Sequence, residues 1–427
     1  NPKEYNGYKA YWDDGAQMIA PHDRNTIAEV NQIRNAGEIK FKGNKSLIEV
    51  IGKEMDQRYI NDLTTISLSP ESIARHKDMK IVYTPIHGTG VEIVPAALKA
   101  FGFTNIIHVP EQDIVSGDFP TVISPNPEEP AALAMAVQRA KDTDAELVLA
   151  TDPDADRVGA AVKNNEGEWV LLNGNQTALM FVYYLITRWK ELGKIKGNEY
   201  IVKTIVSTEL IRTIAERNGV ELYDVYTGFK WIAAIMKDNE GKKTFIGGGE
   251  ESYGFLCEDF VRDKDAVSAC TMLAETAAWA KDKGLTLYQL LQNIYVEYGF
   301  SKEAGISVVK KGKSGAEEIE AMMKHFRENP LTQIAGSNVT YVYDYATLKG
   351  LSVAENEKIT LDMPTTSNVI QYFTEDNTKV SIRPSGTEPK IKFYCEVHSK
   401  VKNLEELPAA ELAAQEKINQ IKISLGI

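Results

Sequence analysis

Residues 147–157 read LVLATDPDADR, a short apolar run followed at once by an acidic loop. Four consecutive apolar residues bounded by polar ones predict a short buried strand from Leu147 to Ala150. The loop that starts at Asp152 then projects from the end of this strand. Polar loops at the ends of short central strands are typical of open α/β sheets, which bind ligands at that edge. This stretch therefore predicts the fold class and a first candidate site.

Strands alternate with amphipathic helices on both sides of this stretch, which is the pattern of α/β layers. The expected strands are 80–83, 105–109, 200–204, 221–225 and 244–246, and the expected helices are 91–101, 130–141, 208–218, 316–328 and 409–425. From about Phe300 the strands become longer, which predicts a separate α+β domain. We therefore expect successive α/β mixed-sheet domains and a C-terminal α+β domain, with boundaries near residues 70, 190 and 300. The expected parts are 1–70, 71–190, 191–300 and 301–427.

The amino-acid composition and net charge argue against several classes of function. The 427 residues include 48 Lys and Arg against 60 Asp and Glu, which gives a net charge of −12. Such a charge repels phosphate backbones, so nucleic-acid binding is not expected as the main activity. The longest apolar stretch, 178–186, is too short to span a bilayer. Three widely separated cysteines without metal spacing are typical of reduced thiols in a cytoplasmic protein.

The acidic loop has the composition of a site for a hard cation. Asp152, Asp154 and Asp156 alternate along it, and carboxylate oxygens are the ligands that Mg²⁺ prefers. An EF-hand would need Gly and Glu at the positions that hold Arg157 and Lys163, so that interpretation fails. A solvated acidic turn is the alternative. Arg157 beside the carboxylates suits a phosphate that approaches the metal.

A second loop, GGGEESYG at 247–254, follows the expected strand at 244–246. Its glycines allow a ligand to approach the backbone, and Glu250 and Ser252 can bind neighbouring sugar hydroxyls. A flexible glycine turn with exposed glutamates is the alternative.

A third loop, RPSGTEPK at 383–390, lies between two strands. Its guanidinium, hydroxyls and backbone N–H groups suit a phosphate, although a proline-bounded hairpin turn is the alternative. The phosphate-binding residues would be Arg383, Ser385, Gly386 and Thr387.

Three lysines are weaker candidates, because most lysines are surface charges. Lys9 and Lys264 would need a lowered pKa to act as bases near neutral pH, and sequence alone does not show one. Lys230, in TGFKW, is a candidate for phosphate binding or a plain surface residue. His87 follows a strand in a glycine-containing loop, and we expect it to be structural.

The three loops, in this order across three units, resemble motifs of the α-D-phosphohexomutase family. DPDADR, GEESYG and RPSGTEP each match a family motif, and the resemblance covers essentially the whole chain. NPKEYNGYK, TGFKW and GGGEESYGF are most similar to the phosphoglucomutase branch. The resemblance implies four domains that each lend a loop to the active site, and a phosphoserine in a Ser-His-Asn-Pro sequence. The chain opens with Asn1-Pro2, so we expect that serine just before Asn1 and interpret residues 1–70 as the remnant of a first domain.

The implied reaction interconverts glucose 1-phosphate and glucose 6-phosphate through the phosphoserine and glucose 1,6-bisphosphate. Mannose phosphates are a further substrate class that the resemblance allows. One Mg²⁺ per chain would lie on the acidic loop, with the bisphosphate as activator and intermediate. The resemblance implies a catalytic role for Lys9, Lys264 and Arg157. It implies substrate binding for Glu250, Ser252 and Lys230, and for the four residues of the third loop. The three aspartates would bind the metal. Hexose phosphates are the expected partners, without nucleic acid or membrane, and the protein is expected to be a monomer or homodimer.

Two further interpretations stay open. One is a phosphopentomutase or a hexose-bisphosphate synthase, because the Glu250 loop is too alike across these enzymes to separate them. The other is a catalytically silent protein that binds sugar phosphates. The choice of acid or base also stays open between Lys9, Lys264 and the histidine expected before Asn1.

Overall fold

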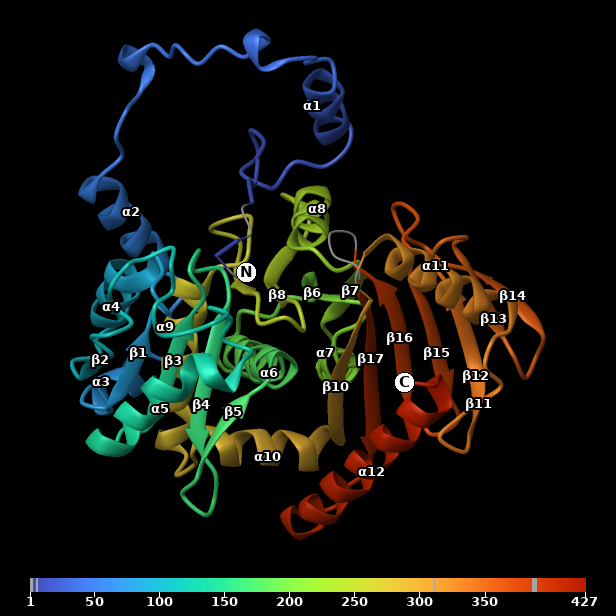
Figure 1. Ribbon diagram of the computed structural model, residues 1–427. Coiled ribbons are helices and arrows are strands. Elements are labelled where there is room, and N and C mark those ends of the chain that lie inside the picture. The colour runs from blue at the N-terminus through green and yellow to red at the C-terminus, as the bar shows by residue number, and fades with distance from the viewer. Residues whose placement is uncertain (1–2, 5–6, 311, 386–389) are drawn as a thin grey trace. The chain divides into compact units, whose positions relative to one another are not determined.

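A computed structural model describes residues 3–4, 7–310, 312–385 and 390–427 (Figure 1). The chain divides into two compact units. The first contains Asn1–Thr204 and Ile214–Leu290, and the second contains Ile205–Thr213 and Leu291–Ile427. The predicted α/β organisation with a C-terminal α+β part is confirmed.

The first unit contains two mixed sheets. The first sheet has the order β2-β1-β3-β4-β5. β1, β2 and β3 pair in parallel, whereas β4 pairs antiparallel with both β3 and β5. Its strands are β1 (Ile81–Thr84), β2 (Ile106–His108), β3 (Leu147–Thr151), β4 (Val158–Lys163) and β5 (Trp169–Leu172). All five residues of β3 are buried, as their apolar run predicts. Helix α5 (Pro130–Thr143) covers this sheet with its alanines, which pack on Val82 and Val148.

The second sheet has the order β7-β6-β8-β9, with β9 antiparallel to three parallel strands. Its strands are β6 (Glu199–Thr204), β7 (Glu221–Val225), β8 (Thr244–Gly249) and β9 (Phe255–Cys257). The prediction that the strand stops at Ile246 is wrong, because Gly247–Gly249 pair with both neighbouring strands. A Cβ on Gly248 would lie 2.7 Å from the Val202 carbonyl oxygen, and one on Gly249 would lie 2.4 Å from the Phe255 ring. The glycines therefore allow close packing in the sheet rather than loop flexibility.

The other helices of the first unit connect and cover these sheets. They are α2 (Lys53–Thr64), α3 (Pro70–Arg75), α4 (Gly90–Phe101), α6 (Gly174–Glu191), α8 (Phe229–Asn239) and α9 (Ala266–Asp282). Helices α7 (Leu210–Arg217) and α10 (Leu287–Tyr298) extend across the division between the units. The apolar stretch 178–186 lies in α6, which begins with a capping box between Asn173 and Gln176. Among the described residues, no helix is long and apolar enough to cross a membrane.

Helix α9 lies in the interior of the first unit, where its residues Ala266–Ala280 are all buried. It follows the second sheet in sequence but packs on α3, α4, β3 and β4 as well as on β9. The Glu275 carboxylate accepts bonds from the backbone N–H groups of Leu68 (2.6 Å) and Ser69 (2.8 Å), and from the hydroxyls of Ser67 and Tyr184 (both 2.6 Å). One buried acid therefore holds the turn between α2 and α3.

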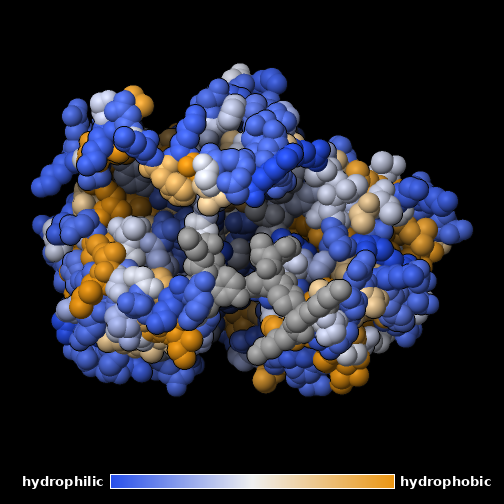
Figure 2. Space-filling view, turned by 45° about the horizontal axis from the view of Figure 1, so that its top comes forward, coloured by the Kyte–Doolittle hydropathy of each residue, from blue (hydrophilic) through white to orange (hydrophobic). Residues whose placement is uncertain are grey.

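The segment before α2 contrasts with this interior. It contains α1 (His22–Val30) and two single turns, Ala36–Glu38 and Lys45–Leu47, and every residue from 24 to 58 is exposed. Its large apolar side chains include Ile27, Val30, Phe41, Leu47, Ile48, Val50 and Ile51. On the face drawn in Figure 2, apolar residues form small groups among polar ones. So many exposed apolar side chains in one segment are typical of a surface that another element covers.

The second unit is built on an antiparallel sheet of order β10-β17-β16-β15-β12-β13-β14, with β11 beside β12. Its strands are β10 (Phe300–Val309), β11 (Gln333–Ile334), β12 (Ser337–Asp344), β13 (Lys349–Ser352), β14 (Glu357–Thr360), β15 (Ile370–Thr374), β16 (Lys379–Pro384) and β17 (Lys390–Ser399). Helix α11 (Gly312–Glu328) packs on β16 and β17. Helix α12 (Leu407–Leu425), preceded by the turn Leu404–Glu406, packs on β10 and β17.

Replacing the buried acid of α9 tests its structural role. We expect Glu275→Ala to lower the free energy of unfolding of the first unit by about 3 kcal/mol or more, because each buried donor left unpaired costs about 1–3 kcal/mol. Urea denaturation followed by tryptophan fluorescence, to which Trp279 of the same helix contributes, measures this loss. Glu92→Ala, at an exposed position of α4, is the matched control. Equal midpoints for the two variants would contradict the assignment.

Acid titration tests the end of the same helix. Asp282 accepts hydrogen bonds from Arg75 and Ser72 and contacts His76, and the Arg75 bond lowers the pKa of its carboxyl below the ordinary value. A carboxyl whose pKa is lower in the folded state stabilises that state above its unfolded pKa of about 3.9, and this contribution fades as pH falls. Asp282→Asn should therefore lower the melting temperature near pH 7 and flatten its decline below about pH 5. Parallel curves for both proteins would refute this.

Candidate functional site

The three aspartates of the acidic loop converge. The loop joins β3 to β4, and each aspartate offers one carboxylate oxygen within 4.8 Å of the others. Asp152 and Asp156 are buried, whereas Asp154 is exposed. Asp152 Oδ1 accepts hydrogen bonds from the N–H groups of Asp156 (3.0 Å) and Arg157 (2.9 Å), which turn the loop back on itself. Ala155 takes a left-handed conformation (φ 55°) at the tip.

The electrostatics of this loop favour a cation. Burial, with the charges of Asp156 and Asp154, raises the pKa of Asp152 to about 8. At Asp154 burial acts in the same direction, but the hydrogen bond from Lys9 prevails and lowers the pKa to about 2. Carboxylates that repel one another in a buried site are stabilised by a metal ion that shares their charge. The donor set, all carboxylate oxygen, suits Mg²⁺ or Ca²⁺.

Cationic side chains already surround these aspartates. Lys9 Nζ lies 2.8 Å from Asp154 and 2.5 Å from Asp156, and Lys264 Nζ lies 2.9 Å from Asp156. Arg157 Nε is 3.8 Å from Asp152 and 3.9 Å from Asp156. Burial alone would lower the pKa of both lysines, but the neighbouring carboxylates prevail and raise it. Both ammonium groups are therefore held in the charged form, and neither is prepared to accept a proton.

The acidic loop rests on a glycine that the sequence did not single out. A Cβ on Gly88 would lie 2.3 Å from the Cα of Pro153, and the backbone N–H of Thr89 donates to the Pro153 carbonyl (2.9 Å). No sequence pattern indicated that this loop touches Pro153, and only the packing shows it. His87 is buried, and its ring nitrogens contact Ile114 O and Thr121 Oγ1 (both 2.8 Å), which makes it structural as expected.

The Gly-Glu-Glu loop lies beside the acidic loop. The Tyr253 carbonyl accepts a hydrogen bond from Val158 N–H (3.0 Å), directly after Arg157. Glu250 is buried, and its Oε1 accepts from the N–H of Gly228 (2.7 Å), a partner that no sequence pattern indicated. Burial raises the pKa of Glu250, while the nearby charge of Lys264 opposes this. The structure thus brings Glu250 and Lys264 together with the aspartates.

The remaining candidates of the first unit are less buried. Ser252 is half-buried in the Gly-Glu-Glu loop. Lys230 is half-buried in the first turn of α8, and its Nζ lies 5.2 Å from the centroid of the Trp231 ring. Tyr11, which the sequence did not indicate, donates a hydrogen bond to Asp263 (2.7 Å) beside Lys264. It adds an exposed aromatic group near the two lysines.

The phosphate-loop candidates belong to the second unit. Arg383 lies near the end of β16, opposite Lys392 of β17. Ser385 follows β16, and its N–H donates to the Lys390 carbonyl (2.8 Å). Gly386 and Thr387 lie outside the described residues. Arg383 and Ser385 thus precede residues 386–389 in the chain, and Lys390 follows them.

Comparisons with known proteins give three family matches. Residues 57–167 match the phosphoglucomutase/phosphomannomutase alpha/beta/alpha domain II, residues 173–298 match domain III, and residues 338–414 match the C-terminal domain. The chain is 35% identical to a phosphoglucomutase of Staphylococcus haemolyticus over 412 residues, 95% of this chain and 73% of that protein. It is 36% identical to a phosphoglucomutase of Staphylococcus aureus over 398 residues, 92% of this chain and 70% of that protein.

Solved structures agree on the fold. A phosphoglucomutase/phosphomannomutase family protein from Burkholderia thailandensis matches with a TM-score of 0.58 at 16% identity, over 87% of this chain and 65% of that chain. The open form of Paramecium parafusin, a phosphoglucomutase, has the same TM-score and identity over 88% of this chain and 63% of that chain. The chain therefore spans just under two thirds of these structures.

Gly88→Ala tests the support of the acidic loop without altering a carboxylate. The added methyl group would displace Pro153, so we expect Mg²⁺ affinity to fall by about tenfold or more, as for other changes behind metal ligands. Titration calorimetry with Mg²⁺ measures it. Gly117→Ala is the matched control, since a Cβ there meets nothing within 4 Å. An unchanged affinity in Gly88→Ala would exclude this role.

Proposed function

The chain belongs to the phosphoglucomutase/phosphomannomutase family, and we propose that it serves the interconversion of glucose 1-phosphate and glucose 6-phosphate through a phosphoserine and glucose 1,6-bisphosphate. The observation that carries this proposal is the convergence of three aspartates, two charged lysines and Glu250 in the first unit. A phosphoryl transfer needs positioned positive charge more than covalent chemistry, and Lys9, Lys264 and Arg157 would supply it here together with a bound cation.

Asp152, Asp154 and Asp156 would hold one Mg²⁺ per chain. Their spacing within 4.8 Å and the raised pKa of Asp152 fit a divalent cation, and Lys9 already bridges two of them as a monovalent one. A bound Mg²⁺ would supply neutralisation of the charge on a transferring phosphoryl group.

The protein's own side chains would divide the remaining work. Lys9 and Lys264, both protonated, would hold a phosphoryl oxygen or donate a proton to the departing sugar oxygen. Arg157 would add a planar guanidinium for phosphate. Glu250 and Ser252 would accept and donate hydrogen bonds to sugar hydroxyls, which exist in similar positions in both orientations of the bisphosphate.

Further groups would hold the phosphate that does not react. Arg383 and Ser385, with Gly386 and Thr387, would bind it, and Lys230 would contribute a charge from α8. Bidentate guanidinium contacts and hydroxyl donors are the usual means of fixing a phosphate in one orientation.

We further propose that residues 1–70 are the end of a first domain that carries the phosphoserine. The exposed apolar side chains between Ile27 and Ile51 support this, because such side chains normally lie inside a fold. The curated relatives are also longer than the part that this chain matches.

Turnover measurements test the proposed reaction. The polypeptide expressed from the complete gene, with Mg²⁺ and a trace of the matching bisphosphate, should convert glucose 1-phosphate fastest among glucose, mannose and ribose 1-phosphates. Asp154→Asn should reduce turnover by about a hundredfold or more, because it removes a charged metal ligand. Glu166→Gln, at an exposed turn, is the control. A ribose preference would indicate a phosphopentomutase, and no conversion would favour a bisphosphate synthase or a silent binder.

A further inference from the structure

A nine-residue segment, Ile205–Thr213, follows β6 directly, and we call it the strap. The strap is part of the second unit, although the residues on both sides of it belong to the first. Its first five residues precede α7. The strap is therefore a piece of the first unit's chain path that is built into the second unit's core.

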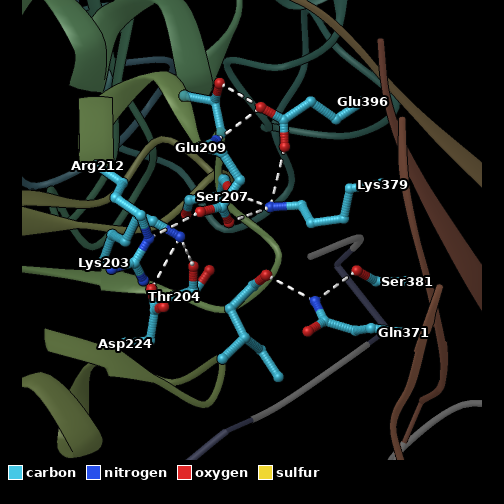
Figure 3. Close-up of polar contacts among 12 residues, drawn as sticks. Lys203, Thr204, Ser207, Glu209, Arg212, Asp224, Gln371, Lys379, Ser381 and Glu396 are labelled. Carbon is cyan, nitrogen blue, oxygen red and sulfur yellow. Dashed lines mark hydrogen bonds and ion pairs between the residues drawn. The ribbon is translucent and has the colours of Figure 1, made fainter. Parts of the chain in front are cut away.

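Buried side chains of the C-terminal sheet hold the strap by its backbone (Figure 3). Gln371 of β15 donates to the Ile205 carbonyl and to Ser381 Oγ, both at 2.7 Å. Lys379 of β16 donates to the Ser207 carbonyl at 2.6 Å and pairs with Glu209 at 2.7 Å. Both Gln371 and Lys379 are only 1% exposed. Two alternate carbonyls of the strap are thus bound from neighbouring strands.

Glu396 of β17 completes this arrangement. It is buried, pairs with Lys379 at 2.9 Å, and accepts hydrogen bonds from Glu209 N–H (2.6 Å) and Thr208 Oγ1 (2.7 Å). Burying charges is costly unless they are paired and hydrogen-bonded. Here Lys379 is paired and hydrogen-bonded, and Glu396 accepts hydrogen bonds at Oε1 and pairs with Lys379 through Oε2. These directional contacts hold the strap to three neighbouring strands of the sheet.

The residue before the strap reaches the candidate sugar-binding loop. Thr204 is fully buried at the end of β6, and its hydroxyl donates to Glu251 at 2.8 Å. Glu251 adjoins Glu250, whose backbone N–H donates to the Gly254 carbonyl across the same loop (2.8 Å). One peptide bond therefore separates the residue that Gln371 holds from the residue that binds Glu251.

We propose that Lys379 and Gln371 are positioning residues that fix the strap and, through Thr204, place the Glu250–Glu251 loop for the sugar. They would act on substrate binding from the C-terminal sheet without touching the substrate. The consequence for the sugar rests on the proposed function, whereas the consequence for the loop does not.

Hydrogen exchange of the backbone amides tests the link. In Lys379→Met and in Gln371→Met, we expect exchange about tenfold faster both in 204–209 and in 249–254, because loss of an anchor lowers the cost of local opening. Lys417→Met is the matched control, since it breaks a C-terminal ion pair with Asp376 that does not touch the strap. If Lys379→Met does not fold, Gln371→Met still tests the link, because it removes no charge.

Kinetics of the polypeptide from the complete gene separate positioning from plain stability. We expect KM for glucose 1-phosphate to rise by about fivefold or more with a smaller change in kcat, because uniform sugar binding is lost. Lys379→Arg should restore part of the affinity. Faster exchange confined to 204–209, or unchanged exchange in both variants, would overturn the proposal. If exchange at 249–254 changes in the variants but the unsubstituted protein shows no turnover, the link between the strap and the loop stands and only the proposed function is rejected.

Discussion

The burial of helix α9 from Ala266 to Ala280 is the constraint on which the first unit depends. Three acids, one before the helix, one in its buried part and one at its exposed end, bind it to its neighbours. Asp265 caps its start and binds Tyr59, Glu275 holds the turn between α2 and α3, and Asp282 holds α3 itself. The start of the helix also contacts the candidate site, because Lys264 lies just before it and Ala266 N–H donates to the Ala155 carbonyl of the acidic loop (3.1 Å). The same helix thus supports both the core of the first unit and the acidic loop.

Charge balance explains the composition of the site. Three aspartates lie close together. Two lysines and an arginine pair with these aspartates, rather than with distant carboxylates, and offset their negative charge. The three positive side chains are therefore held at the acidic loop, in a protein whose total charge is −12.

The sequence predicted the features that depend on neighbouring residues. The strand at Leu147 and the loop after it were predictable because an apolar run and alternating acids are local signals. Gly247–Gly249 were misassigned because strand pairing and close contact with Phe255 are not local. Helix α9 was not predicted, since a helix buried on all sides shows no apolar periodicity. The meeting of Lys9 with Asp156, 147 residues away, could come only from the fold or from the family resemblance.

The position of α9 in the chain also governs the order of events during synthesis. Ser67 and Glu275 are 208 residues apart, so the first sheet and the α2–α3 turn are made long before the helix that completes their core. At translation rates of roughly 5–20 residues per second, this interval lasts about 10 to 40 seconds. The last strand of the first sheet ends at Leu172, so for the later part of that time the sheet is complete but lacks the helix that packs on β3 and β4, and this side of the sheet stays open to solvent until α9 is made.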